Sequence, residues 1–108
     1  MLIYKQQLPM STGVDVIELP YKDVKEAKEN IMHLEVQYDW PCMWYNVVEE
    51  EEKEFLLITV GTGHDWGDIL TKEDYIGSLV TAEGCLVWHY FLLEKDALEK
   101  RKDEHIDV

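Results

Sequence analysis

The residues best suited to chemistry lie in one short segment, Gly61-Thr62-Gly63-His64-Asp65-Trp66-Gly67, which follows a long apolar run. Glycines at the end of a strand allow main-chain N–H groups to surround an anion, but they also occur at bends and bulges. The segment lacks the Lys-Ser/Thr pair of a nucleotide-binding P-loop. The pattern therefore favours a backbone bend over a phosphate site. As part of a binding site, His64 would offer an imidazole and Trp66 a stacking face.

The four histidines do not follow a metal-binding pattern. Cys85 and His89 share one face of a predicted strand, but at about 3.3 Å per residue they lie roughly 13 Å apart, too far for one zinc ion. A site assembled from separate strands, for example from His64, His89 and Cys42, is compatible with the sequence. We expect no metal and no cofactor.

Covalent catalysis needs an activated Ser or Cys with a base within reach. Ser11 and Ser78 lie outside any recognisable nucleophile elbow, and neither cysteine has a signature context. Carboxylate pairs such as Asp65 and Asp68 are common in an acidic chain and indicate surface charge. The sequence predicts a protein that is not an enzyme.

Large aromatic side chains gather around the apolar segments and the glycine-rich segment, and most of them are expected in the core. They are Trp40, Trp44, Trp66, Trp88, Tyr38, Tyr45 and Tyr90. Trp66 is the exception, because it lies in a predicted loop, where an exposed indole is a typical binding anchor.

The charge balance excludes direct binding to nucleic acid. The chain has 108 residues with 23 acidic against ten basic side chains, a formal net charge of −13. Its one arginine, Arg101, lies near the C-terminus, and such a surface repels a phosphate backbone. The acidity provides solubility, or it mimics nucleic acid toward a basic partner. The residues that would carry this mimicry are Glu49, Glu50, Glu51, Glu52 and Glu54.

Alternation with a period of two predicts strands along most of the chain. The expected strands are 2–8, 14–19, 32–37, 42–48, 55–60, 75–82 and 85–93. Leu34, Val36, Tyr38 and Trp40 would share one buried face, and the continuous apolar run 55–60 predicts a strand covered on both faces. Turns are expected at 11–13, 38–41 and 83–84, and 49–54 is expected to be a charged hairpin loop.

Helical structure is expected at three places only: an insert at 21–30, a turn that begins at Thr71, and the charged segment 96–105. The fold class is therefore mainly β: an antiparallel β-sandwich or open barrel of about seven strands, with one short helical insert and a charged C-terminal tail. We expect a single β domain at 1–94 and a charged helix or tail at 95–108.

The first seven residues lack the charged start, apolar stretch and cleavage site of a signal peptide. The longest uncharged run, 84–93, is too short to cross a bilayer. We expect a cytoplasmic protein without membrane contact. In that compartment Cys42 and Cys85 are expected to be free thiols, both buried in strands.

Four motifs occur in order: Pro41-Cys42-Met43-Trp44, Gly61-Thr62-Gly63-His64, Tyr75-Ile76-Gly77-Ser78 and Leu86-Val87-Trp88-His89-Tyr90-Phe91. With these motifs, residues 2–94 resemble a family of short phage and prophage proteins of unknown function. The insert at 23–30 and the tail after Lys95 depart from that family. The resemblance implies a bacteriophage origin and a β fold, and it implies no reaction.

Three functions follow as expectations. The first is a non-enzymatic phage accessory protein, in the cytoplasm of the host cell, that counteracts host defence by sequestering a small nucleotide-like signal. Its ligand-binding residues would be Thr62, Gly63, His64, Trp66, Trp44 and His89, and a homo-oligomer is one form it could take. The alternatives are an acidic protein inhibitor of a host restriction or CRISPR effector, and a virion or replication accessory protein. The ligand hypothesis requires His64 and Trp66 to lie beside an accessible cavity.

Overall fold

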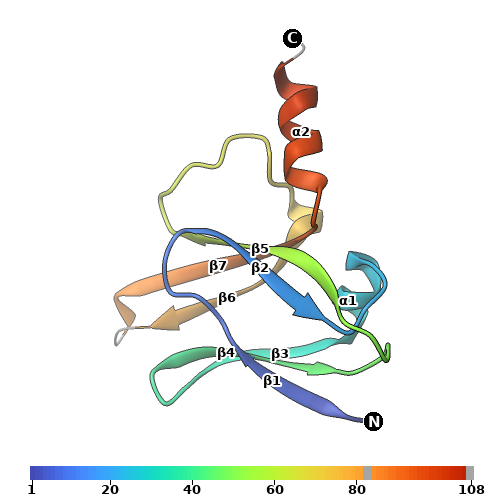
Figure 1. The fold of residues 1–108 in the computed structure, drawn as a ribbon. Coiled ribbons are helices and arrows are strands. Elements are labelled where there is room, and N and C mark those ends of the chain that lie inside the picture. The colour runs from blue at the N-terminus through green and yellow to red at the C-terminus, as the bar shows by residue number, and fades with distance from the viewer. Residues whose placement is uncertain (82–83, 107–108) are drawn as a thin grey trace.

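Two antiparallel sheets face each other in the computed structural model, which describes residues 1–81 and 84–106 (Figure 1). The three-stranded sheet has the order β1-β4-β3 and the four-stranded sheet the order β2-β5-β7-β6. The strands are β1 (Ile3–Gln7), β2 (Gly13–Leu19), β3 (Ile31–Gln37), β4 (Trp40–Asn46), β5 (Lys53–Gly61), β6 (Tyr75–Thr81) and β7 (Leu86–Glu94). The predicted mainly β, antiparallel fold is confirmed, and the sandwich-like arrangement is the form it takes.

The main core fills the space between the sheets. Its largest buried side chains include Tyr21, Phe55, Leu57, Tyr90 and Leu92. Because neighbouring residues on a strand point to opposite faces, the alternate residues of β5 point outward, where a second buried cluster forms. That cluster comprises Leu56, Ile58, Val60, Leu93 and Leu98. Strand β5 is therefore covered on both faces, as its continuous apolar run predicts.

Three short helices complete the described chain: α1 (Val24–Asn30), the 3-10 turn η1 (Lys72–Asp74) and α2 (Ala97–Ile106). Asp23 caps α1, because its carboxylate accepts a hydrogen bond from the Glu26 N–H at 2.8 Å. Thr71 precedes η1 at the N-cap position, as predicted. The helical insert is confirmed, and the charged C-terminal segment contains α2. Within the described residues, no helix is both long and apolar enough to span a membrane.

The predicted turn at 38–41 is a two-residue hairpin loop. Tyr38 and Asp39 both have positive φ values, 51° and 65°, and Gln37 pairs with Trp40 across them. Such a tight loop is typical of twisted β-hairpins. Tyr38 is 92% exposed, so the predicted buried face of this strand ends before Tyr38. Trp40 is also exposed, at 42%.

One predicted connection is different in the structure. Strands β4 and β5 belong to different sheets, so the predicted hairpin loop at 49–54 is wrong: this segment belongs to a crossing between the sheets, and β5 already begins at Lys53. The turn predicted at 11–13 also lies between strands of different sheets. Alternation identifies a strand but does not identify its partner, which explains the error.

Both cysteines are free, as expected, but only Cys42 is buried. Cys85 is exposed, because it lies just before β7 begins at Leu86, beyond the packed part of the strand. Of the turn predicted at 83–84, Glu83 lies outside the described residues, as does Ala82, the predicted end of the preceding strand.

Candidate functional site

A cleft of about 610 Å³ lies on the outer face of the four-stranded sheet. The connection 62–71 covers it, and this connection stands on the same side of the sheet as α2 (Figure 1). Five of the six predicted ligand-binding residues line the cleft: Thr62, Gly63, His64, Trp66 and His89. His64 is exposed and Trp66 partly buried, so the condition set for a ligand site is met.

Strand pairing explains which side chains reach the cleft. In one row across the sheet, Val60 pairs with His89 and His89 pairs with Ser78. In another row, Phe91 of β7 pairs with Tyr75 of β6. Residues directly opposite in neighbouring strands share one face of a sheet. All five side chains therefore point to the outer face.

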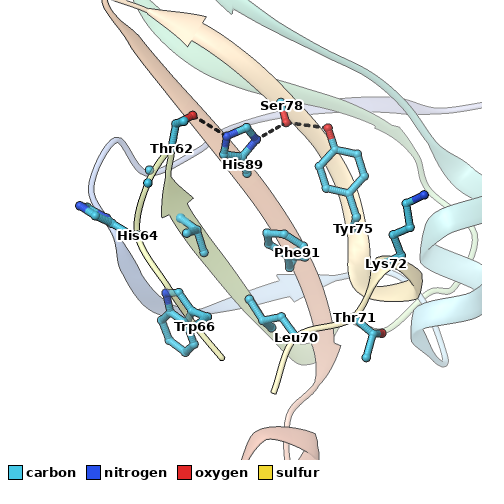
Figure 2. Close-up of a pocket in the computed structure, with 13 residues that line it drawn as sticks. Thr62, His64, Trp66, Leu70, Thr71, Lys72, Tyr75, Ser78, His89 and Phe91 are labelled. Atoms are coloured by element: carbon cyan, nitrogen blue, oxygen red, sulfur yellow. Dashed lines mark hydrogen bonds between the residues drawn. The ribbon is translucent and has the colours of Figure 1, made fainter. Parts of the chain in front are cut away.

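Much of the cleft wall is apolar. Val60 and Phe91 form its sheet side, and Trp66 and Leu70 line it from the connection (Figure 2). The rings of Tyr75 and Phe91 meet edge to face, with centroids 5.6 Å apart. A concave, apolar surface with a few oriented polar groups is typical of small-molecule sites.

The polar groups form a continuous row along one side of the cleft (Figure 2). Thr62 Oγ1 lies 2.7 Å from His89 Nε2, and His89 Nδ1 lies 2.7 Å from Ser78 Oγ. Ser78 Oγ in turn lies 2.6 Å from Tyr75 Oη. Both ring nitrogens of His89 are thus bonded to hydroxyl groups. In a catalytic triad of the Ser-His-Asp type, one ring nitrogen contacts a carboxylate instead.

His64 lies at the border of the cleft. Its Nδ1 is 2.6 Å from Thr12 Oγ1, and its ring points away from His89 in Figure 2. The ring rests against Gly61, where an added Cβ would lie 3.4 Å from the imidazole and 3.3 Å from Trp88 Cζ3. Gly61 therefore lets His64 pack closely and hold the connection against the segment that precedes β2.

The glycines act mainly through backbone geometry. Gly63 has a positive φ of 93°, which favours glycine. The N–H of Thr62 donates to the Val87 carbonyl at 3.3 Å, and that of His64 donates to the Gly61 carbonyl at 3.1 Å. Two of the N–H groups that an anion site would use are therefore bonded within the protein.

Positive charge at the cleft is limited. Lys72 lines it, whereas Arg101 is bound to Asp74 through both terminal nitrogens. Burial favours a higher pKa for Asp74, but the hydrogen bonds from Arg101 and Thr71 outweigh it and hold the pKa below its ordinary value. Within the residues that the structure describes, no three His, Cys, Asp or Glu side chains are grouped to hold a metal ion.

Comparison with protein families decides the classification. Residues 1–101 match the model of a family described as a domain of unknown function, DUF7352. The chain belongs to this family. No curated protein and no solved structure matches it. The matched part of the DUF7352 domain includes every residue that lines the cleft, and it ends at Arg101.

Trp44, the sixth predicted residue, is not part of the cleft. It lies in β4 of the other sheet of the DUF7352 domain, where its ring centroid is 5.8 Å from that of His33. The sequence identifies Trp44 as a strand residue, but alternation alone does not show to which sheet its strand belongs.

The acidic segment is separate from the cleft. Glu49 to Glu52 line a polar hollow of about 620 Å³ together with Tyr21, Lys22 and Lys53. Lys53 Nζ lies 3.2 Å from Glu94, and Lys95 Nζ lies 2.6 Å from Glu54. Lysines thus interrupt the acidic surface of the DUF7352 domain at this end.

The lining residues that the sequence pattern does not identify include Tyr75, Ser78 and Lys72. The signal for Ser78 was present, because alternation in the expected hairpin of 75–82 with 85–93 allows Ser78 and His89 on one face. They are separated by 11 residues in the chain and joined by the hairpin. The pairing register, which the sequence does not specify, decides their contact.

Proposed function

We propose that the protein is a non-enzymatic binding protein that takes up a small nucleotide-like molecule in the cleft. The observation that carries this proposal is the combination of an apolar cleft of about 610 Å³ with a hydrogen-bonded polar row on one side. A planar heterocycle satisfies both parts, because its faces are apolar and its edge carries donors and acceptors.

Aromatic side chains support a planar ligand. Trp66 contributes from the connection, and Phe91 and Tyr75 contribute from the sheet. Stacking of a base on an aromatic ring is worth roughly 1–3 kcal/mol per base and requires no charge. This source of affinity remains available to a protein whose own net charge of −13 repels anions.

Charge limits the ligand to few phosphate groups. Lys72 lies at the cleft, and the arginine of the chain is already engaged by Asp74. A nucleoside or a monophosphate therefore suits the cleft better than a polyphosphate does. The hydroxyl partners of His89 support a role without catalysis, since an imidazole base in a triad is oriented by a carboxylate.

The proposed biological role is based on the resemblance to short phage proteins. A phage protein that takes up a nucleotide-like molecule in the host cytoplasm would lower the concentration of a defence signal. The resemblance supports this role, and the chemistry of the cleft supports the class of ligand.

Thermal stabilisation by ligand tests the proposal. The purified protein is melted with each of a panel of nucleosides, mononucleotides and cyclic dinucleotides. We expect at least one to raise the melting temperature of the wild type. Trp66→Ala should lose the effect, and Trp44→Ala, on the other sheet, should keep it. An unchanged melting temperature across the whole panel contradicts the proposal, as does equal loss in both variants.

A second candidate function is inhibition of a basic host protein by the acidic surface. The exposed Glu50, Glu51 and Glu52 favour it, whereas the ion pairs of Lys53 and Lys95 weaken it. Binding of this kind weakens steeply with salt. Substitution of all three glutamates by lysine should abolish co-purification of a host partner. If the partner still co-purifies, this surface is not its binding site.

A further inference from the structure

The lining of the cleft differs in charge from the rest of the chain. Acidic side chains outnumber basic ones by 23 to ten in the whole sequence. Among the described residues that line the cleft, however, there is no aspartate or glutamate, whereas Lys72 is one of them. The carboxylates of the neighbouring connection, Asp65 and Asp68, do not belong to this lining. An anion in the cleft therefore meets the Lys72 ammonium group and no carboxylate among these lining residues.

Basic side chains gather around the turn η1, which contains Lys72. Arg101 of α2 forms a bidentate ion pair with Asp74, and Lys28 of α1 donates from Nζ to the carbonyl oxygen of Glu73. Three basic side chains thus stand against the two acidic side chains of η1, a local balance of +1 in a chain with a net charge of −13. At physiological salt, exposed charges farther apart than about 8 Å are largely screened. The local balance therefore matters more for a ligand in the cleft than the net charge does.

Lys72 is the cation of this group that a ligand can reach. Arg101 and Lys28 are engaged in the contacts just described, whereas Lys72 forms no ion pair within the described part of the chain. Its side chain is exposed. Tyr75 follows η1 directly, and its N–H donates to the carbonyl oxygen of Lys72. The lysine is therefore anchored beside the aromatic part of the cleft, on the Tyr75 side in Figure 2.

We infer that the cleft selects nucleoside monophosphates over uncharged nucleosides, with Lys72 as the specificity-determining residue that binds the phosphate. This inference rests on the proposed function. Hydrogen bonds between an ammonium group and a phosphate are charge-assisted and roughly twice as strong as neutral ones. One accessible ammonium group matches one phosphate group. Further phosphates would face an acidic surface without a second available cation of η1.

The hydroxyl groups of the cleft suit the uncharged part of such a ligand. Tyr75 Oη and Ser78 Oγ lie 2.6 Å apart beside the aromatic lining. Because a hydroxyl group both donates and accepts, these groups adapt to sugar hydroxyls and to the edge of any base. They therefore add affinity without choosing among bases, and the charge at Lys72 makes the choice between phosphorylated and unphosphorylated forms.

A series that keeps the base and changes only the phosphate tests the inference. The nucleoside, 5′-monophosphate and 5′-triphosphate of adenine, guanine, cytosine and uracil are titrated by calorimetry at physiological salt without divalent cations. For at least one base, we expect the monophosphate to bind about tenfold or more tightly than its nucleoside. The triphosphate of that base should bind no more tightly than the monophosphate.

Variants of Lys72 assign the preference to its charge. Lys72→Met keeps an apolar stem, so it should lower the affinity for the monophosphate to that for the nucleoside and leave nucleoside binding within about twofold. Lys72→Arg should retain the preference. The matched control is Lys25→Met on α1, which removes the same charge from an exposed position outside the cleft lining. It should change the preference by less than about twofold, because distant charges are screened.

The outcomes separate the inference from the function beneath it. Equal binding of nucleoside and monophosphate for every base, or tighter binding of the triphosphate, overturns the inference while the proposed function stands. A preference that Lys72→Met retains also overturns it, because the phosphate would then bind elsewhere. If the whole series fails to bind but a cyclic dinucleotide stabilises the protein, the inference alone fails. If neither the series nor the cyclic dinucleotides bind, both fail.

Discussion

Arg101 forms a bidentate ion pair with Asp74: Nη1 lies 2.6 Å from Oδ2, and Nη2 lies 2.9 Å from Oδ1. Nη1 also donates to the carbonyl oxygen of Ile69 at 3.0 Å. The Asp74 side chain is only 8% exposed. These contacts join α2 to η1 and to the connection that covers the cleft. Arg101, which the sequence predicts in a charged helix or tail, therefore fixes one side of the cleft in place.

Removal of this guanidinium should destabilise the protein. Arg101→Ala leaves the Asp74 carboxylate buried without its main partner, and we expect a loss of about 2 kcal/mol in the free energy of unfolding. Arg101→Lys should restore only part of the lost stability. The ammonium group keeps the positive charge but cannot form the bidentate contact. Urea denaturation measures both. The neighbouring exposed Lys102→Ala should stay within about 0.5 kcal/mol of wild type. An Arg101→Ala protein as stable as Lys102→Ala would show that the ion pair contributes nothing.

The same pair predicts a dependence on acid. The pKa of Asp74 is lowered in the folded protein, with burial opposing and the Arg101 and Thr71 hydrogen bonds prevailing. A carboxyl with a lowered folded pKa stabilises the fold above its unfolded pKa, near 3.9, and loses that contribution as pH falls further. Asp74→Asn should therefore be less stable than wild type at pH 6, and the difference should shrink below about pH 4. A difference that stays constant down to pH 2 would contradict the lowered pKa.

The strands of this fold can be predicted from the sequence, but the order in which they pair cannot. Period-two patterning reports which segments are strands and which side chains share a face, so the strands and the doubly covered β5 could be predicted. Patterning does not report which strands pair. The pattern therefore predicts a hairpin loop at 49–54, although this segment links the two sheets.

The site shows the same division. Thr62, His64 and Trp66 could be found because glycines and a lone indole interrupt the apolar pattern. The contact of Ser78 with His89 depends on register, and the contact of Arg101 with Asp74 spans 27 residues. Residue type alone predicts Trp44 as a ligand-binding residue, whereas the sheet order places it in the other sheet. Residue types thus indicate candidate site residues, and the pairing of the strands determines which of these residues are in contact.

Gly77 marks a close approach of the two sheets. A Cβ built on it would lie 2.8 Å from Leu34 Cδ2, and Leu34 belongs to β3 in the opposite sheet. Gly77→Ala must displace the Leu34 side chain, and we expect a loss of about 1–2 kcal/mol in the free energy of unfolding. In a Leu34→Ala background the methyl group has room, so the added cost should be smaller there.

Gly13→Ala is the matched control, because a Cβ at Gly13 meets no atom within 4 Å. It should change the free energy of unfolding by no more than about 0.5 kcal/mol. Chemical denaturation of the three single variants and the double variant completes the cycle. Strictly additive losses for Gly77→Ala and Leu34→Ala would mean that the two residues do not oppose each other across the sheets.

Tyr21 should make the protein sensitive to alkali. Burial, with smaller contributions from Tyr45 and Glu26, raises its pKa to about 12, and its hydroxyl donates to the Asn46 carbonyl at 2.7 Å. Because the folded pKa lies above the unfolded value near 10, the neutral phenol contributes stability that is complete below pH 10 and is lost as pH rises toward 12. Tyr21→Phe should lower the free energy of unfolding by about 1 kcal/mol at pH 8, and this loss should shrink above pH 10.

The control is Tyr38→Phe, at a position 92% exposed, which should leave the alkaline stability profile unchanged. Ionisation of Tyr21 near pH 10 in the folded wild type, read from tyrosinate absorbance against Tyr21→Phe, would refute the shift, because a phenol that loses its proton so readily cannot be held neutral by the core around it.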